Sequence, residues 1–196
     1  MLTEKPQGRR RLGSVTRSAA QARVLDAALG LFTERGVSGT SLQMIADAVG
    51  VTKAAVYHQF RTKEEIVIAV TDAELGKLED ALEAAEAEDD PLRARKVLLT
   101  RVIDMAIDRR GAVRTLQSDP VIIRLLGEHA PFQRFISRLY GVLLDEDDDT
   151  DARISAALLS GAIAGGIVSP IVDDVDDATL KAAVLQLTRR MLNLPE

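Results

Sequence analysis

The chain has 196 residues, of which 46% are hydrophobic, and a formal net charge of −5 at pH 7. This length is sufficient for one large or two small domains, and because only 3% of the residues are aromatic, the core must be mainly aliphatic. The sequence contains no Cys, which excludes disulfides, thiolate zinc sites and a cysteine nucleophile, and it has no apolar N-terminal signal, so we expect a cytoplasmic protein.

The N-terminal third of the chain is basic although the whole chain is acidic. Residues 1–65 contain 10 Lys and Arg against 6 Asp and Glu, whereas residues 66–196 contain 15 against 24. A basic patch confined to one region is the electrostatic pattern expected of nucleic-acid binding. Residues 1–16 contain Gly, Pro and several cations without helical periodicity, so we expect a flexible basic arm there. Such an arm can enter a minor groove, and the same composition also fits a solvated tail without defined contacts.

A first helix is predicted to begin after Ser18, which lies three residues before Gln21 at the spacing of a capping box. Gly36 is placed to end this helix. The apolar face expected to pack on the following helices consists of Val24, Leu25, Ala28, Leu31 and Phe32.

Residues 40–63 read as two short helices joined by a tight turn. Thr40 lies three residues before Gln43, again at capping-box spacing, so a helix should begin near Ser41. Gly50 stands where a left-handed residue would end that helix. Thr52 then offers a hydroxyl N-cap for a second helix over residues 53–60, the expected recognition helix of a helix-turn-helix.

A further helix is expected to begin just after this unit. Thr62 lies three residues before Glu65, which places Lys63 in the first turn beside unpaired backbone N–H groups. A helix N-terminus of this kind favours a phosphate.

These residues resemble the DNA-binding domain of the tetracycline-repressor (TetR) family over about residues 18–70. The resemblance is carried by the helix ending at Gly36, the Gly50-Val51 turn and the run from Val56 to Glu65. It implies an all-α protein of about nine helices. It also implies a three-helix DNA-binding domain over residues 17–63 and a helical ligand-binding and dimerisation domain over residues 64–196.

The resemblance also implies which side chains contact DNA. Those expected to face base edges or the groove floor are Thr52, Lys53, Ala54, Ala55 and His58, and those expected to contact phosphates are Thr40, Ser41, Tyr57 and Lys63. We expect Lys63 and Tyr57 to set affinity and salt dependence, and Lys53 and His58 to set sequence preference. Phe60 is interpreted as a packing residue of the small domain.

The remaining chain is predicted to be helical. A long helix is expected over about 63–88 and another over 91–110, with Gly111 as its C-cap. Breaks at Pro120 and Gly127 suggest two short helices within 112–130, and a further helix should follow Pro131. The acidic run 145–151 lacks the turn glycine and distal Glu of a calcium loop, so we interpret it as a linker.

Helical periodicity suggests a ligand pocket in the second domain. The predicted lining is Arg101, Val102, Met105, Leu116, Ile123, Phe132, Phe135, Ile136 and Tyr140. Arg101 would anchor an anion, and the aliphatic remainder suggests a small apolar molecule. The same residues would equally fill a closed core.

Residues 154–172 carry no charge, so a membrane helix must be considered. We reject it because the segment is only moderately apolar and its flanks are acidic. A soluble helix that is apolar all round should be buried on every side. With the last helix, over 177–193, it would form a hairpin, and two hairpins would make a homodimer interface through about 152–170 and 177–193. A monomer core using the same residues is the alternative.

No residue pattern indicates an enzyme, a metal site or a cofactor. The two histidines, His58 and His129, have no partner at metal-ligand or triad spacing. We interpret His129 as structural or exposed, with a place in a ligand pocket as the alternative. The resemblance to the TetR family implies a homodimeric repressor that a small apolar ligand releases from a palindromic double-stranded DNA operator. A ligand-independent activator or architectural factor, or a protein-interaction adaptor of the same fold, are the alternatives.

Overall fold

A computed structural model describes residues 11–144 and 150–195, and all regular structure in these ranges is helical. The helices are α1 (Ala19–Arg35), α2 (Leu42–Val49), α3 (Lys53–Gln59), α4 (Lys63–Leu75), α5 (Glu79–Glu86), α6 (Pro91–Asp108), α7 (Arg110–Ser118), α8 (Pro120–Glu128), α9 (Ala130–Leu144), α10 (Thr150–Val168) and α11 (Asp177–Met191), with short 3-10 helices η1 (Gly76–Leu78) and η2 (Pro170–Val172). The expected all-α class is confirmed. The number of helices in the described ranges exceeds the expected nine partly because the predicted helix 63–88 is divided.

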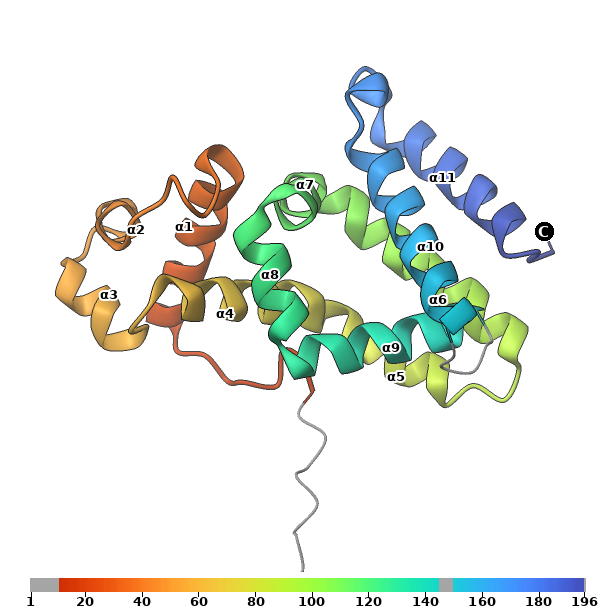
Figure 1. Cartoon of the computed structure of the whole chain (residues 1–196), viewed down its shortest axis with the longest axis horizontal. Coiled ribbons are helices and arrows are strands. Elements are labelled where there is room, and N and C mark those ends of the chain that lie inside the picture. Colours follow the sequence, from red (N-terminus) through yellow and green to blue (C-terminus); the bar gives the residue numbers. More distant parts are fainter. Residues whose placement is uncertain (1–10, 145–149, 196) are drawn as a thin grey trace, which may run out of the picture.

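Helices α1, α2 and α3 form a small domain at one end of the molecule, and α4 leads from it into the larger helical domain (Figure 1). The predicted capping box of α1 is present, since Ser18 Oγ accepts from the Gln21 backbone and Gln21 Oε1 accepts from the Ser18 backbone. Gly50 has the left-handed conformation expected at the end of α2, with φ of 76°. Thr52 caps α3 by accepting from the Ala55 backbone at 3.2 Å.

The predicted helix 63–88 is interrupted at Gly76, which opens η1, so the expectation of one continuous helix is wrong. Gly13 passes over this point in a left-handed conformation with φ of 71°. A Cβ added to Gly76 would lie 2.5 Å from the Gly13 Cα, so the two backbones are in direct contact. The interruption therefore coincides with a contact between residues that are distant in sequence.

Residues 11–17, which we name the N-terminal strap, run along α4 toward α5. Arg11 pairs with Asp80 at 2.6 Å and with Glu83 at 2.7 Å. Leu12 is 4% exposed and belongs to the core of the larger domain. The part of the expected basic arm that the structure describes is therefore bound to the second domain. Residues 1–10 lie outside the described residues.

Two apolar clusters hold the molecule together. The first fills the larger domain between α5, α6, α9, α10 and α11 and includes Leu98, Ile103 and Phe135. The second is centred on the small domain, with Phe32 and Ile45, but it also contains residues of α4 and α8. Helix α8 therefore packs against α4, which in turn contacts α1.

The α10–α11 hairpin lies at the other end of the molecule from α3 (Figure 1). Leu159, Ile163 and Ile167 of α10 are buried in the core, whereas Ile154 and Leu158 are 54% and 67% exposed. One protomer therefore buries only one side of this segment, and the expected burial of the other side depends on the second copy. No helix in the described ranges is long and apolar enough to cross a bilayer.

The end of α6 differs from expectation. Helix α6 ends at Asp108 with Arg109 as its C-cap, and Gly111, the expected cap, lies inside α7. Asp90 and Asp119 cap the starts of α6 and α8, because each accepts from two backbone N–H groups of the following turn.

Candidate nucleic-acid interface and pockets

Helix α3 presents a polar surface to solvent while its other face is fixed in the small-domain core. Val56 is fully buried and Phe60 is 7% exposed, which supports the interpretation of Phe60 as a packing residue. Tyr57 is 55% exposed. The predicted DNA contacts on or beside α3 that are also exposed are Thr52, Lys53, Ala54 and His58, and Ala55 is half-buried.

The N-terminus of α2 is capped by Ser41, not by Thr40 as the sequence suggested. Ser41 Oγ accepts from the Met44 backbone at 3.2 Å and remains exposed beside the unpaired first-turn N–H groups. Thr40 is 2% exposed, and its hydroxyl donates to the Gly36 carbonyl at 2.8 Å. The structure therefore leaves Ser41 in position for a phosphate, whereas the Thr40 side chain holds the loop before α2.

Lys63 is also placed differently from the expectation. Its ammonium donates to the carbonyls of Val37 at 2.6 Å and Thr40 at 2.8 Å. Two of the three ammonium protons are thus directed into the loop between α1 and α2. The predicted cap of α4 is present, because Thr62 Oγ1 accepts from the Glu65 backbone at 3.1 Å.

Asp119 joins the two domains, and sequence analysis gave it no role beyond a helix break. It caps α8 through Oδ1, which accepts from the Val121 backbone at 2.9 Å. Its Oδ2 accepts from the Val37 backbone at 2.7 Å, in the loop between α1 and α2. Because Asp119 is only 9% exposed, this one carboxylate fixes both the start of α8 and the small domain.

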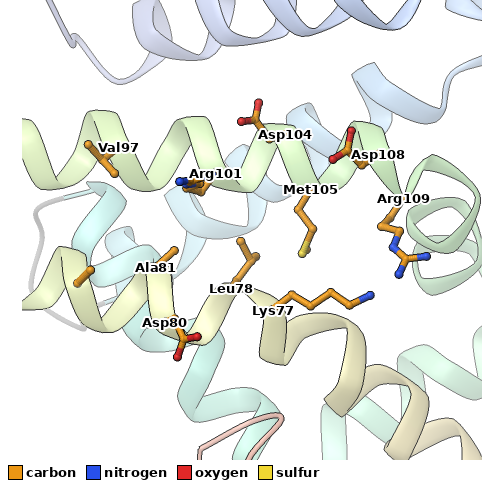
Figure 2. Close-up of a pocket in the computed structure, with 11 residues that line it drawn as sticks. Lys77, Leu78, Asp80, Ala81, Val97, Arg101, Asp104, Met105, Asp108 and Arg109 are labelled. Carbon is orange, nitrogen blue, oxygen red and sulfur yellow. The ribbon is translucent and has the colours of Figure 1, made fainter. Parts of the chain in front are cut away.

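The first pocket lies between α5 and α6 and has a volume of about 620 Å³; we name it the α5–α6 pocket. Figure 2 shows Leu78 and Met105 pointing toward each other across it. Three of its lining residues are basic and three are acidic, and the others are apolar. The lining is Lys77, Leu78, Asp80, Ala81, Ala84, Val97, Arg101, Asp104, Met105, Asp108 and Arg109.

The second pocket is bounded by α8, α9 and α10 and has a volume of about 680 Å³; we name it the α8–α10 pocket. Its wall is mainly apolar, with hydroxyl groups from three residues. The lining is Leu126, Gly127, Phe132, Gln133, Ile136, Ser137, Tyr140, Gly141, Leu144, Arg153, Ala156, Ala157 and Ser160.

A smaller pocket of about 370 Å³ lies under the N-terminal strap. Arg138 crosses its wall and pairs with Glu86 at 2.7 Å and with the buried Glu79 at 2.5 Å. The hydrogen bonds that Arg138 donates to Glu86 and Glu79, and the charges of both carboxylates, raise the Arg138 pKa despite the opposing effect of burial. Because Arg138, Glu79 and Glu86 pair with one another, we interpret these charged residues of the wall as structural.

The predicted ligand-lining residues do not share one cavity. Arg101 and Met105 line the α5–α6 pocket, and Phe132, Ile136 and Tyr140 line the α8–α10 pocket. Phe135 is a core residue beside the small pocket, Val102 packs against the core, and Ile123 is 53% exposed. The side chain of Leu116 lies outside the described residues. Helical periodicity predicts which side chains face inward, but it does not show which pocket or core they face. Inward-facing residues on adjacent turns of one helix can face different neighbouring helices.

The two histidines and the acidic groups form no metal site in the described part of the chain, where no three potential ligands come together. His58 is exposed on α3, and His129 caps the end of α8 outside all three pockets. The acidic run at 145–149 lies outside the described residues.

The similar proteins named below are all described as transcriptional regulators or repressors. Residues 24–70 match the family model described as "Bacterial regulatory proteins, tetR family". The HTH-type transcriptional regulator AcrR of Shigella flexneri is 36% identical over 87 residues, which cover 43% of this chain and 40% of AcrR. The chain thus spans less than half the length of this curated relative.

A longer match extends into the second domain. The HTH-type transcriptional repressor Rv3405c of Mycobacterium tuberculosis is 32% identical over 163 residues, or 80% of this chain and 76% of the repressor. Among solved structures, the transcriptional regulator FadR from Bacillus subtilis in complex with stearoyl-CoA has a TM-score of 0.66 at 19% identity and covers 85% of this chain and 96% of its own. At this identity the likeness concerns the fold.

Proposed function

The chain belongs to the TetR family of bacterial regulatory proteins, and from this premise we propose that it is a homodimeric transcriptional repressor. The dimer binds a palindromic DNA operator and leaves it when a small, mainly apolar molecule binds. The observation that carries the proposal is α3, whose buried Val56 and Phe60 leave Lys53, Tyr57 and His58 exposed together.

The exposed face of α3 fits a recognition helix in a major groove. Lys53 and His58 offer donors to base edges, and Tyr57 and Ser41 offer hydroxyls to the backbone phosphates on either side. Lys63 contributes by holding the loop that carries Ser41, through its bonds to the carbonyls of Val37 and Thr40.

The homodimer is supported by the exposed apolar face of the α10–α11 hairpin, which we name the hairpin face. Ile154, Leu158, Leu187 and Met191 are each more than half exposed. Exposed glycines at positions 161 and 165 continue the same stripe of α10 and permit close helix approach. Two such faces related by a two-fold axis would form a four-helix interface, with recognition helices about 34 to 36 Å apart on the operator.

Control by a ligand is supported by the two large pockets in the second domain and by the description of FadR in complex with stearoyl-CoA. A ligand that releases DNA must bind the DNA-incompetent state more tightly. Shifting the population from 1:99 to 99:1 requires about 5.5 kcal/mol of differential affinity.

The test is fluorescence-anisotropy titration against duplexes that tile the intergenic DNA beside the gene, at several salt concentrations. We expect tight binding to one palindromic tile and loss of that preference in Tyr57→Ala. Equal weak binding to every tile, with the same salt slope in the wild type and the variant, would leave only non-specific electrostatics and refute the proposal.

A further inference from the structure

The chemistry inside the α8–α10 pocket differs from that of the other cavities. Its apolar wall includes Leu126, Phe132 and Ile136, and its volume of about 680 Å³ lies within the range of about 300 to 1,000 Å³ usual for small-molecule sites. Among the described lining residues the only charged group is Arg153, which is exposed at the rim. The interior is therefore uncharged.

The polar lining residues that are not exposed, Tyr140 and Ser160, carry hydroxyl groups. Tyr140 is largely buried and hydrogen-bonds with Ser160 of α10, and burial raises the pKa of its phenol. The phenol consequently stays neutral around pH 7 and can both donate and accept a hydrogen bond. An anion held beside Tyr140 and Ser160 would have only the exposed Arg153 as a compensating charge, whereas a hydroxyl or carbonyl group would find hydrogen-bond partners there.

One wall of the pocket is shared with the DNA-binding domain. Leu126 of α8 lines the pocket and is also a member of the apolar cluster that contains Phe32 and Ile45. Phe132 lines the pocket and packs against the same cluster. A molecule that displaces either side chain must therefore disturb the packing of this shared cluster, in which α8 contacts α4 and α4 contacts α1.

The other end of α8 is tied to the same domain by a polar link. Asp119 caps α8 through Val121 and accepts from the Val37 backbone at 2.7 Å. The carbonyl of Val37 in turn accepts from Lys63, at the start of α4. A shift of α8 would thus reach the loop before α2 and the first turn of α4 together.

We propose that the α8–α10 pocket binds an uncharged, largely apolar molecule whose hydroxyl or carbonyl group contacts Tyr140, and that α8 transmits its presence to the DNA-binding helices through Asp119. The coupling half of this proposal rests on the proposed DNA-binding function. The binding half can be tested without DNA.

The binding test uses Nile red, an uncharged apolar dye with a carbonyl group whose fluorescence rises in apolar surroundings. Ile136→Trp and Ser160→Leu both fill the pocket, so each should weaken dye binding by about tenfold or more. Tyr140→Phe removes only the hydroxyl and should weaken it by about threefold to tenfold. Met105→Trp, which fills the α5–α6 pocket, serves as the matched control and should leave the affinity within about twofold.

Two results would overturn the binding half. One is Nile red affinity that is unchanged in both pocket-filling variants, provided circular dichroism shows at least one of them folded like the wild type. The other is tighter binding of the anionic dye anilinonaphthalene sulfonate than of Nile red, with that binding lost in Ser160→Leu, because it would assign an anion to the site.

The coupling test compares the DNA dissociation constant with and without saturating Nile red. In the wild type the dye should weaken binding to the preferred tile by at least about fivefold. Asp119→Asn can still cap α8 but presents an N–H group toward Val37, so it should bind the dye normally and bring this ratio close to one. Glu128→Gln, an acid-to-amide change at the exposed end of α8, should keep the wild-type ratio.

An unchanged ratio in Asp119→Asn, or a wild-type ratio of one despite dye bound in the pocket, would overturn the coupling. Failure of the wild type to prefer any DNA tile would refute the proposed function instead. The dye measurements on Ile136→Trp, Ser160→Leu and Tyr140→Phe would still decide the binding half in that case.

Discussion

Lys63 illustrates how one residue of a recognised motif can serve the fold. Its ammonium lies against the carbonyls of Val37 and Thr40, and Thr40 donates its own hydroxyl to Gly36. These bonds close the loop between α1 and α2, which has few other backbone partners. Lys53, in contrast, is exposed on α3 and makes no hydrogen bond or ion pair with any described residue.

We predict that Lys63→Met lowers the free energy of unfolding by about 1 to 3 kcal/mol, because two loop carbonyls lose their donor. Lys53→Met should change it by no more than about 0.5 kcal/mol and should instead weaken discrimination between DNA tiles. Urea unfolding measures the first effect and anisotropy the second. If Lys63→Met unfolds like the wild type and lowers the salt slope by about one, Lys63 is a phosphate contact after all.

The caps and turns of the helix-turn-helix were predictable because their signals are local. Thr52, Gly50 and Ser18 act within four residues of their own positions, so spacing along the chain indicated each cap or turn correctly. Asp119 was not recognised as a link because its partner Val37 is 82 positions away. No local pattern distinguishes a carboxylate that only caps a helix from one that also bonds another domain.

At the scale of helices, the division of the predicted helix 63–88 has the same origin. Its sequence suits one continuous helix, but the N-terminal strap crosses it where Gly13 meets Gly76. Around this crossing, Gly13 N donates to Asp72 at 3.1 Å, and Arg17 pairs with the same carboxylate. The strap therefore fixes the junction between α4 and α5 by backbone contact, which requires glycine on both sides.

We predict that Gly76→Ala destabilises the protein by about 1 to 3 kcal/mol, the usual cost of overpacking, because the new methyl group would overlap the Gly13 backbone. Gly141→Ala in α9 is the matched control. Nothing lies within 4 Å of its added Cβ, so helix propensity alone should make that variant up to about 1 kcal/mol more stable. Thermal and urea unfolding of the pair measure the difference, and equal stabilisation of both variants would contradict the contact.

At the scale of the whole molecule, α8 contributes side chains both to the apolar cluster of the small domain and to the wall of the α8–α10 pocket. Ile122, Leu125 and Leu126 complete the cluster of the small domain, and the end of the same helix lines the α8–α10 pocket. The sequence predicted inward-facing residues here but could not assign them to a domain, because both neighbours of α8 are apolar. Because α8 lies between the two, Leu126 belongs both to the pocket wall and to the apolar cluster of the small domain.

The hairpin face concerns the contact between two protomers. Residues 154–172 carry no charge, yet the protomer buries only one side of α10, with Leu159 at 3% exposure beside Leu158 at 67%. A segment that is apolar on both sides needs cover on both sides. The proposed second copy provides it.

We predict that Leu158→Arg separates the protomers and weakens binding to the preferred DNA tile by about 100-fold or more, since each protomer then engages one half-site alone. In a two-fold interface each substitution introduces two charges close together, which adds repulsion to the loss of apolar contact. Val97→Arg is the control, because Val97 is 50% exposed on α6 but lies away from the hairpin face. Analytical ultracentrifugation should give a monomer for Leu158→Arg and a dimer for Val97→Arg, with unfolding unchanged in both. A dimer of Leu158→Arg that binds the tile as tightly as the wild type would place the protomer interface elsewhere.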